Sequence, residues 1–134
     1  MYDGEAKNAG LTILMVEVNP EQVSQLKNDI PEWNWQEAPP NWISGSSGLP
    51  TTDEALDAVI VFAKKKEDEH TLTLCKEIRQ HHEMDGIPVL VAINMYQMML
   101  GNEVRRLPCA HFIILPIEKE TLHSKLSQIK SGKF

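Results

Sequence analysis

The sequence predicts one α/β domain in which helices cover both faces of a doubly wound sheet of five parallel strands. Two observations indicate this fold: short apolar runs of strand length recur along the chain, and segments with helical apolar spacing alternate with them. Strands that alternate with helices pair in parallel through right-handed crossovers. At 134 residues, the chain can bury a core without disulfides or metal. We expect a flexible leader over residues 1–10 and a single domain over residues 11–131.

The first part of the chain predicts two strands joined by a helix. Leu11–Val16 is a short apolar run without strict alternation, which is typical of a strand buried on both faces. Asn19 can cap a helix that begins at Pro20, and Pro31 stops that helix. Trp33–Ala38 alternates weakly and predicts the second strand.

The rest of the chain continues the alternation. Residues 39–53 are rich in proline, glycine and serine and predict a loop. Ala58–Ala63 is the clearest strand, a buried run with β-branched residues. The remaining predicted elements are a helix over Thr71–His82, a strand over Ile87–Ile93, a helix over Asn94–Leu107 weakened at Gly101, a strand over Phe112–Leu115, and an amphipathic helix over Glu118–Lys130.

Composition and charge exclude several classes of function. A net charge of −6 argues against a nucleic-acid-binding surface, which needs clustered lysine and arginine. No apolar run has the length of a membrane span and no signal peptide is visible, so we expect a cytoplasmic protein. Cys75 and Cys109 lack redox or metal spacing, and we expect reduced thiols. The histidines show no ligand spacing, so no metal site is expected.

In a sheet of this kind, ligands bind outside the carboxyl ends of the strands. Glu17 is notable there, because a carboxylate follows a buried strand. We expect it to be solvated, since one carboxylate holds Mg²⁺ poorly. Lys64 either neutralises Glu17 across the pocket or is simply exposed, and its charged surroundings favour exposure.

Four segments, in order, resemble the receiver (CheY-like) domain of two-component response regulators: ILMVEVNPEQ, DAVIVFA, LTLCKEIRQHHEMDGIPVLVAIN and FIILPIEKETLHSKL. The resemblance covers roughly Leu11 to Lys130 and is poorest over Trp35–Asp53. It implies a flavodoxin-like sheet with the strand order 2-1-3-4-5.

The resemblance also implies which residues occupy the family's chemical positions. Receivers hold Mg²⁺ with an acidic pair after the first strand and phosphorylate an aspartate after the third. A hydroxyl after the fourth strand and a lysine before the proline of the fifth complete the pocket. The corresponding positions here are Glu17 and Val18, then Ala63 or Phe62, then Ile93 and Leu115. The chain therefore resembles a pseudo-receiver, without a phospho-acceptor, catalytic residue, metal or cofactor.

The leading hypothesis is a non-enzymatic module of two-component or phosphorelay signalling that works by protein–protein interaction without aspartate phosphorylation. In receivers, the fourth helix, fifth strand and fifth helix commonly form the contact face, for a homodimer or a partner. The candidate residues on this face are Met95, Met98, Met99, Phe112 and Ile114. Core filling is the alternative for the methionines.

Two further hypotheses remain. The first is a flavodoxin-like regulatory domain that binds a small molecule in a pocket lined by Glu17, Phe62, Ala63, Asn94 and Leu115. The second is an active receiver phosphorylated at a displaced acid, Asp68 or Glu67, although both lie several residues beyond the strand.

Overall fold

The computed structural model describes residues 11–38, 56–80 and 86–131. Its five parallel strands form one sheet in the order β2-β1-β3-β4-β5, as predicted. The strands are β1 (Thr12–Val16), β2 (Asn34–Glu37), β3 (Ala58–Phe62), β4 (Val89–Ile93) and β5 (Ala110–Ile114). The order reverses between β1 and β3, so the fold has its switch point there.

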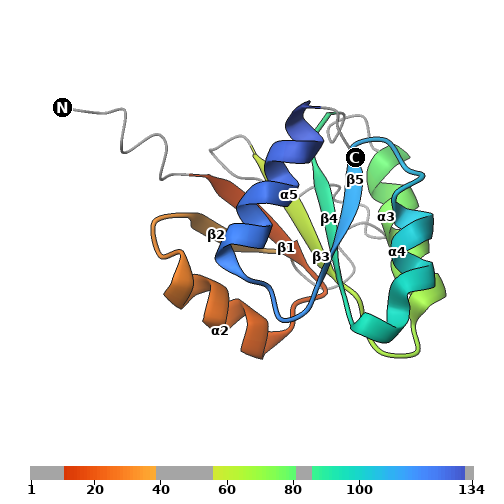
Figure 1. Cartoon of the computed structure of the whole chain (residues 1–134), viewed down its shortest axis with the longest axis horizontal. Helices are drawn as coiled ribbons and strands as arrows, with labels where there is room; N and C mark the ends of the chain where they lie inside the picture. The colour runs from red at the N-terminus through yellow and green to blue at the C-terminus, as the bar shows by residue number, and fades with distance from the viewer. Residues whose placement is uncertain (1–10, 39–55, 81–85, 132–134) are drawn as a thin grey trace.

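Helices cover both faces of the sheet. The helical elements are α2 (Pro20–Asp29), α3 (Asp68–Gln80), the 3₁₀ turn η2 (Met95–Gln97), α4 (Met98–Val104) and α5 (Lys119–Ser131). Figure 1 shows α2 and α5 on one face of the sheet and α3 and α4 on the other. Among the described residues, no helix is long and apolar enough to cross a membrane.

The sheet separates two hydrophobic cores because successive side chains of a strand point to opposite faces. In β1, Ile13 and Met15 pack towards α2 and α5, whereas Leu14 and Val16 pack towards α3 and α4. Every residue of β1, β3 and β4 is buried. This two-sided burial explains why these strands are continuous apolar runs rather than alternating ones.

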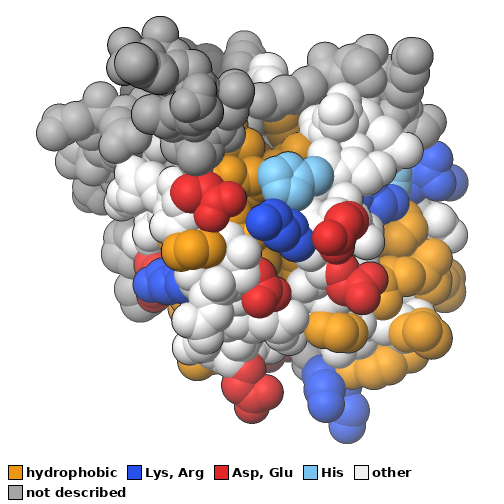
Figure 2. Space-filling model, turned by 60° about the vertical axis from the view of Figure 1, so that its left-hand side comes forward, with side chains coloured by type: hydrophobic (Ala, Val, Ile, Leu, Met, Phe, Trp, Pro, Cys, Tyr) orange, Lys and Arg blue, Asp and Glu red, His pale blue; other side chains and the backbone are white. Residues whose placement is uncertain are grey.

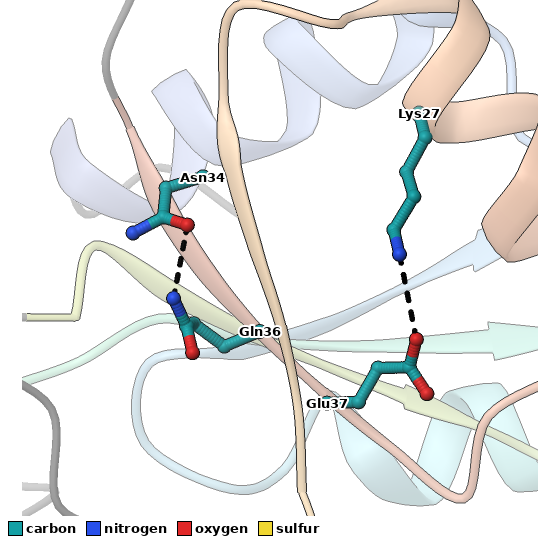
Figure 3. Close-up of polar contacts among 4 residues, drawn as sticks. All are labelled: Lys27, Asn34, Gln36 and Glu37. Carbon is teal, nitrogen blue, oxygen red and sulfur yellow. Dashed lines mark hydrogen bonds and ion pairs between the residues drawn. The ribbon is translucent and has the colours of Figure 1, made fainter.

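The edge strand β2 is more polar than the others. In Figure 3, the Gln36 side chain donates a hydrogen bond to Asn34 on the same face, with 2.9 Å between Nε2 and Oδ1. Lys27 reaches from α2 towards Glu37, and its Nζ lies 3.5 Å from the carboxylate oxygen. Polar side chains are a common feature of sheet edges, because they discourage pairing with a further strand.

Several bounds differ from those predicted. Helix α3 begins at Asp68, three residues before the expected Thr71, and Asp68 and Glu69 suit the positive end of its dipole. Strand β5 begins at Ala110 and ends at Ile114, so Leu115 lies just beyond it. The expected helix over 94–107 is a 3₁₀ turn followed by the short helix α4. The predicted leader and the loop over 39–53 lie outside the described residues.

Candidate functional site

An open hollow of about 320 Å³ lies where the carboxyl ends of β1, β3, β4 and β5 meet. Its lining includes all five residues of the small-molecule hypothesis: Glu17, Phe62, Ala63, Asn94 and Leu115. Val18 and Lys64 also line it. Ile93, at the position of the receiver hydroxyl, is fully buried in the core on the α3 and α4 side.

Glu17 is the acidic side chain that lines this hollow. It follows β1 with a positive φ of 57°, a left-handed conformation that few residues other than glycine adopt. One carboxylate oxygen, Oε1, lies 3.3 Å from Lys64 Nζ and 3.5 Å from His70 Nε2. The carboxylate is therefore paired rather than simply solvated, and its side chain is only 23% exposed. Lys64 is exposed, as expected, and still forms the ion pair.

The other receiver positions around Glu17 bring no side-chain oxygen. Val18 packs against the core, and Phe62 and Ala63 are buried. Leu115 follows β5. Within residues 11–38, 56–80 and 86–131, no group of three histidine, cysteine, aspartate or glutamate side chains could hold a metal ion. A hard divalent cation prefers several oxygen ligands, and this arrangement offers one carboxylate already paired with a cation.

Gln97 joins the two loops that border the hollow. Its side chain is 2% exposed. The amide Nε2 donates to the Lys64 carbonyl oxygen at 3.1 Å and to Asp68 Oδ1 at 2.8 Å. Its Oε1 accepts from the backbone N–H of Asn94 at 2.9 Å and from the Asn94 side-chain amide at 3.0 Å. One buried amide thus ties the β3–α3 loop to the first turn after β4.

Sequence reasoning missed Gln97 and His70. The spacing Asn94-x-x-Gln97 is that of a capping box, a signal that could have drawn attention to Gln97. Its partners Lys64 and Asp68 lie 33 and 29 residues away in the chain, so no local pattern indicates them.

Asp68 and Glu67, the displaced acceptors of the third hypothesis, do not line the hollow at the strand ends. They line a neighbouring hollow between α3 and η2. The Asp68 carboxylate accepts a hydrogen bond from the Gln97 amide. The geometry thus gives this hypothesis no support.

The candidate contact residues divide into two groups. Met95, Met98 and Met99 are 74%, 39% and 83% exposed, so they do not fill the core. Tyr96 is 66% exposed, and with these methionines it accounts for all exposed large hydrophobic residues in the described part of the chain. In contrast, Phe112 is buried and Ile114 is half-buried beside a hollow between β5 and α5.

The β5–α5 hollow has basic and aromatic neighbours. Lys125 Nζ lies 5.0 Å from the centre of the Phe112 ring and 3.4 Å from His111 Nδ1. The backbone N–H of Phe112 also donates to His111 Nδ1 at 2.7 Å. Nδ1 also lies 3.1 Å from the Phe112 carbonyl oxygen, an acceptor to which the protonated ring can donate. Burial, with the nearby Lys125 and Arg105 cations, lowers the pKa of His111.

Charges of both signs share the surface. Figure 2 shows acidic, basic and hydrophobic side chains interspersed over one face, and its basic side chains form no continuous patch among the residues drawn in colour. This distribution agrees with the acidic net charge of −6. Such a face offers no basic track for a phosphate backbone.

Comparison with solved structures identifies the fold. The chain superposes on the N-terminal signal receiver domain of a response regulator from Bacteroides fragilis with a TM-score of 0.65 and 15% identity, covering 90% of this chain and 96% of that one. A putative response regulator from Chloroflexus aurantiacus gives 0.68 and 18%, covering 91% and 98%. A scan against protein-family models and a search of curated proteins found no match.

A third neighbour is the receiver domain of a sensor histidine kinase from Pseudomonas aeruginosa, with a TM-score of 0.60 and 14% identity over 91% of this chain and 98% of that one. That structure has a magnesium ion coordinated in its active-site cleft. These likenesses show that the chain has the CheY-like fold of response regulator receiver domains.

Proposed function

We propose that this chain is a non-enzymatic, cytoplasmic receiver-type signalling module that acts by protein–protein contact, without phosphorylation at the strand-end pocket. The observation that carries the proposal is the ion pair between Glu17 and Lys64, where a receiver would hold its metal and phosphoryl group. The fold provides the receiver framework. The side chains at its chemical positions cannot perform the family's reaction.

Phosphoryl transfer to a receiver needs a carboxylate nucleophile and a divalent cation that neutralises the phosphoryl oxygens. The P. aeruginosa neighbour has magnesium in its cleft. In this chain, the acceptor position falls on Ala63 or Phe62, whose side chains carry no nucleophile. The Lys64 ammonium already neutralises the Glu17 carboxylate, so a cation entering the pocket would have to displace it.

Surface chemistry supports action by contact. In the part of the chain that the structure describes, the four exposed large hydrophobic residues lie within Met95–Met99, on η2 and the start of α4. Methionine side chains adapt to differently shaped partners, and exposed apolar patches mark interaction sites. The partner is either another protein or a second copy of this chain.

The first test is incubation with acetyl phosphate and Mg²⁺, followed by intact-mass measurement, with an active receiver domain as the positive control. We expect no phosphoryl adduct on this chain under conditions that modify the control. An acid-labile adduct that maps to an acidic residue would contradict the proposal.

The second test concerns the contact surface. Replacing Met99→Glu places a charge on the exposed apolar surface, and Asn102→Glu adds the same charge at an exposed position of the same helix. Size exclusion measures dimer formation, and capture from extract measures partner binding. We expect Met99→Glu, but not Asn102→Glu, to abolish the dimer or the partner complex that the wild type forms. If dimer formation and partner binding are unchanged in both variants, the contact surface is elsewhere.

The strand-end hollow favours a second candidate function, a small-molecule regulatory domain. All five residues predicted to line the pocket surround a hollow of about 320 Å³. An NMR fragment screen tests it: saturable shifts at Glu17 and Asn94 that disappear in Ala63→Leu would support a ligand site. Shifts confined to other surfaces would exclude it.

A further inference from the structure

A second hollow, of about 580 Å³, lies between η2 and the first turn of α3, next to the strand-end pocket. Tyr96 and Gln97 line it from η2, and Glu67, Glu69 and His70 from the α3 side. Neither the receiver chemistry nor the small-molecule hypothesis uses this hollow.

Its α3 side is acidic. Glu67, Asp68 and Glu69 are consecutive, and Glu67 and Glu69 are exposed. None of the ion pairs formed within the described residues includes Glu67 or Glu69. Of the two basic side chains in the lining, His70 contacts Glu17, and Lys66 lies beside these acids. Lys64 and Lys65, which precede it in the chain, line the strand-end hollow instead. The lining of this second hollow therefore holds three carboxylates against one lysine.

Its η2 side is apolar. Tyr96 lines the hollow and is 66% exposed, and Met95 and Met99 on either side of it in the chain are 74% and 83% exposed. Flexible thioethers and an aromatic ring form a surface that can pack against aliphatic side chains of differing shape.

Gln97 holds the acidic and apolar sides together. Its amide donates to the Asp68 carboxylate at 2.8 Å, and the residue itself belongs to η2. The first turn of α3 is thereby fixed next to Tyr96. The surface is present in the folded chain without any ligand to assemble it.

We call the surface formed by Glu67, Glu69, Met95, Tyr96 and Met99 the η2–α3 surface. We propose that it binds a basic amphipathic segment of a partner protein, with lysine or arginine side chains facing Glu67 and Glu69. The charge complementarity follows from the acidic rim, and the apolar contact follows from Met95, Tyr96 and Met99. An amphipathic helix lays its apolar face on such a surface and its flanking cations pair with the rim. An anionic membrane or nucleic acid would be repelled by the same carboxylates. This inference rests on the proposed function of protein contact and specifies the partner's chemistry.

The test uses a fluorescent synthetic amphipathic helix of leucine and lysine, with a peptide in which glutamate replaces lysine as the control. Binding to the full chain is measured by anisotropy at low and high salt. The charge variant is Glu67→Lys with Glu69→Lys. Its matched control is Glu32→Lys with Glu120→Lys, which makes the same change of net charge at exposed positions, one of them in a first helical turn.

We expect the lysine peptide to bind, the glutamate peptide not to bind, and salt to weaken the affinity. The Glu67/Glu69 variant should lose about tenfold or more in affinity, and the control pair no more than about twofold. Equal losses in the two variants would indicate attraction to net charge alone and overturn the proposal. Absence of peptide binding would overturn it as well.

A second pair of variants tests the apolar side. Tyr96→Ser with Met99→Ser should also weaken peptide binding, while Ile114→Ser, in the β5–α5 hollow, should not. If Ile114→Ser alone weakens binding, the peptide binds at β5 and α5. The η2–α3 surface is then not the docking site, while protein contact remains the proposed function. A phosphoryl adduct in the acetyl phosphate test would instead overturn the proposed function and leave the peptide result unaffected.

Discussion

The Lys64 ammonium lies 3.3 Å from the Glu17 carboxylate and so connects the carboxyl ends of β1 and β3 across the pocket. On the proposed function, this lysine supplies the positive charge that the magnesium ion supplies in the cleft of the P. aeruginosa neighbour. Because the pair is partly exposed, its contribution to stability is small, about 1 kcal/mol or less. Its consequence is chemical: Glu17, the acidic side chain that lines the hollow, is paired with a cation.

Gln97→Leu should lower the free energy of unfolding by about 2–3 kcal/mol. The substitution keeps the volume of the buried side chain but leaves the Asp68 carboxylate, the Lys64 carbonyl and the Asn94 N–H without their partner. Urea denaturation measures the change. Gln36→Leu, at a half-buried glutamine on the edge strand, is the matched control and should cost about 0.5 kcal/mol or less. Equal losses would show that Gln97 does not act as a connecting residue.

Gly101→Ala should destabilise the protein by about 1–2 kcal/mol, although alanine is the better helix former. A Cβ at this position would lie 2.9 Å from the Phe112 ring and 3.1 Å from Ile93 Cδ1. Overpacking a core costs about 1–3 kcal/mol, which exceeds the gain of up to about 1 kcal/mol in helix propensity. Thermal unfolding measures the balance. Asn102→Ala, exposed on the same helix, should stabilise slightly, and a gain for Gly101→Ala would refute the close packing.

Cys75 should resist thiol reagents in the folded protein and destabilise it at high pH. Burial raises the pKa of the Cys75 thiol to about 12 from a usual 9.0, despite the opposing effect of Arg79. The unfolded chain therefore releases this proton at lower pH than the folded one, so stability is full below about pH 9 and falls as pH rises towards 12.

Two measurements test this behaviour of Cys75. Alkylation with mass mapping should modify half-buried Cys109 first and Cys75 only on unfolding. Denaturation across the alkaline range should show that Cys75→Val loses part of the pH dependence and Cys109→Val retains it. Rapid alkylation of Cys75 in the folded state would contradict its burial.

His111 should make the protein less stable in mild acid. Its pKa is lowered in the folded state by burial and by Lys125, and further by Arg105, whereas the hydrogen bond to Phe112 opposes the shift. The unfolded imidazole therefore takes up a proton at higher pH than the folded one. This contribution to stability is full above about pH 6.5 and is lost as pH falls towards the folded pKa.

Comparison of two variants isolates the His111 contribution. His111→Gln keeps a hydrogen-bond acceptor for the Phe112 N–H but has no proton to bind near neutral pH. The slope of stability against pH below about 6.5 should flatten in His111→Gln relative to the wild type. His123→Gln, at an exposed histidine, serves as the control. An unchanged slope in His111→Gln would show that His111 does not cause the acid sensitivity.

Much of the fold follows from local patterns in the sequence. The two-sided burial of β1, β3 and β4 leaves continuous apolar runs, and Asn19 caps α2 as predicted, accepting from the Glu21 and Gln22 N–H groups. The start of α3 was misplaced because residues 64–70 are charged and carry no apolar period. A tertiary contact, the hydrogen bond from Gln97 to Asp68, holds the first turn of that helix.

The candidate site was predictable in its residues but not in its contacts. Alignment of strand ends was enough to place Glu17, Phe62, Ala63, Asn94 and Leu115 around one hollow. The partners of Glu17 were not predictable, since Lys64 and His70 reach it from a loop and a helix that no local pattern orients. Likewise, exposure of the methionines depends on which face of η2 and α4 packs on the sheet. Three methionines within five positions are compatible with a buried face and with an exposed one.

Amide NMR spectra of the protein alone, with Mg²⁺, and with Mg²⁺ plus beryllofluoride, a mimic of the phosphoryl group, test whether the strand-end pocket binds a metal and a phosphoryl group. If the Glu17–Lys64 pair occupies a pocket that has lost its chemistry, the amide signals of Glu17 and of residues 62–68 stay unchanged in all three spectra. Saturable shifts that cluster at those residues would show a working metal and phosphoryl site and would overturn the proposed function.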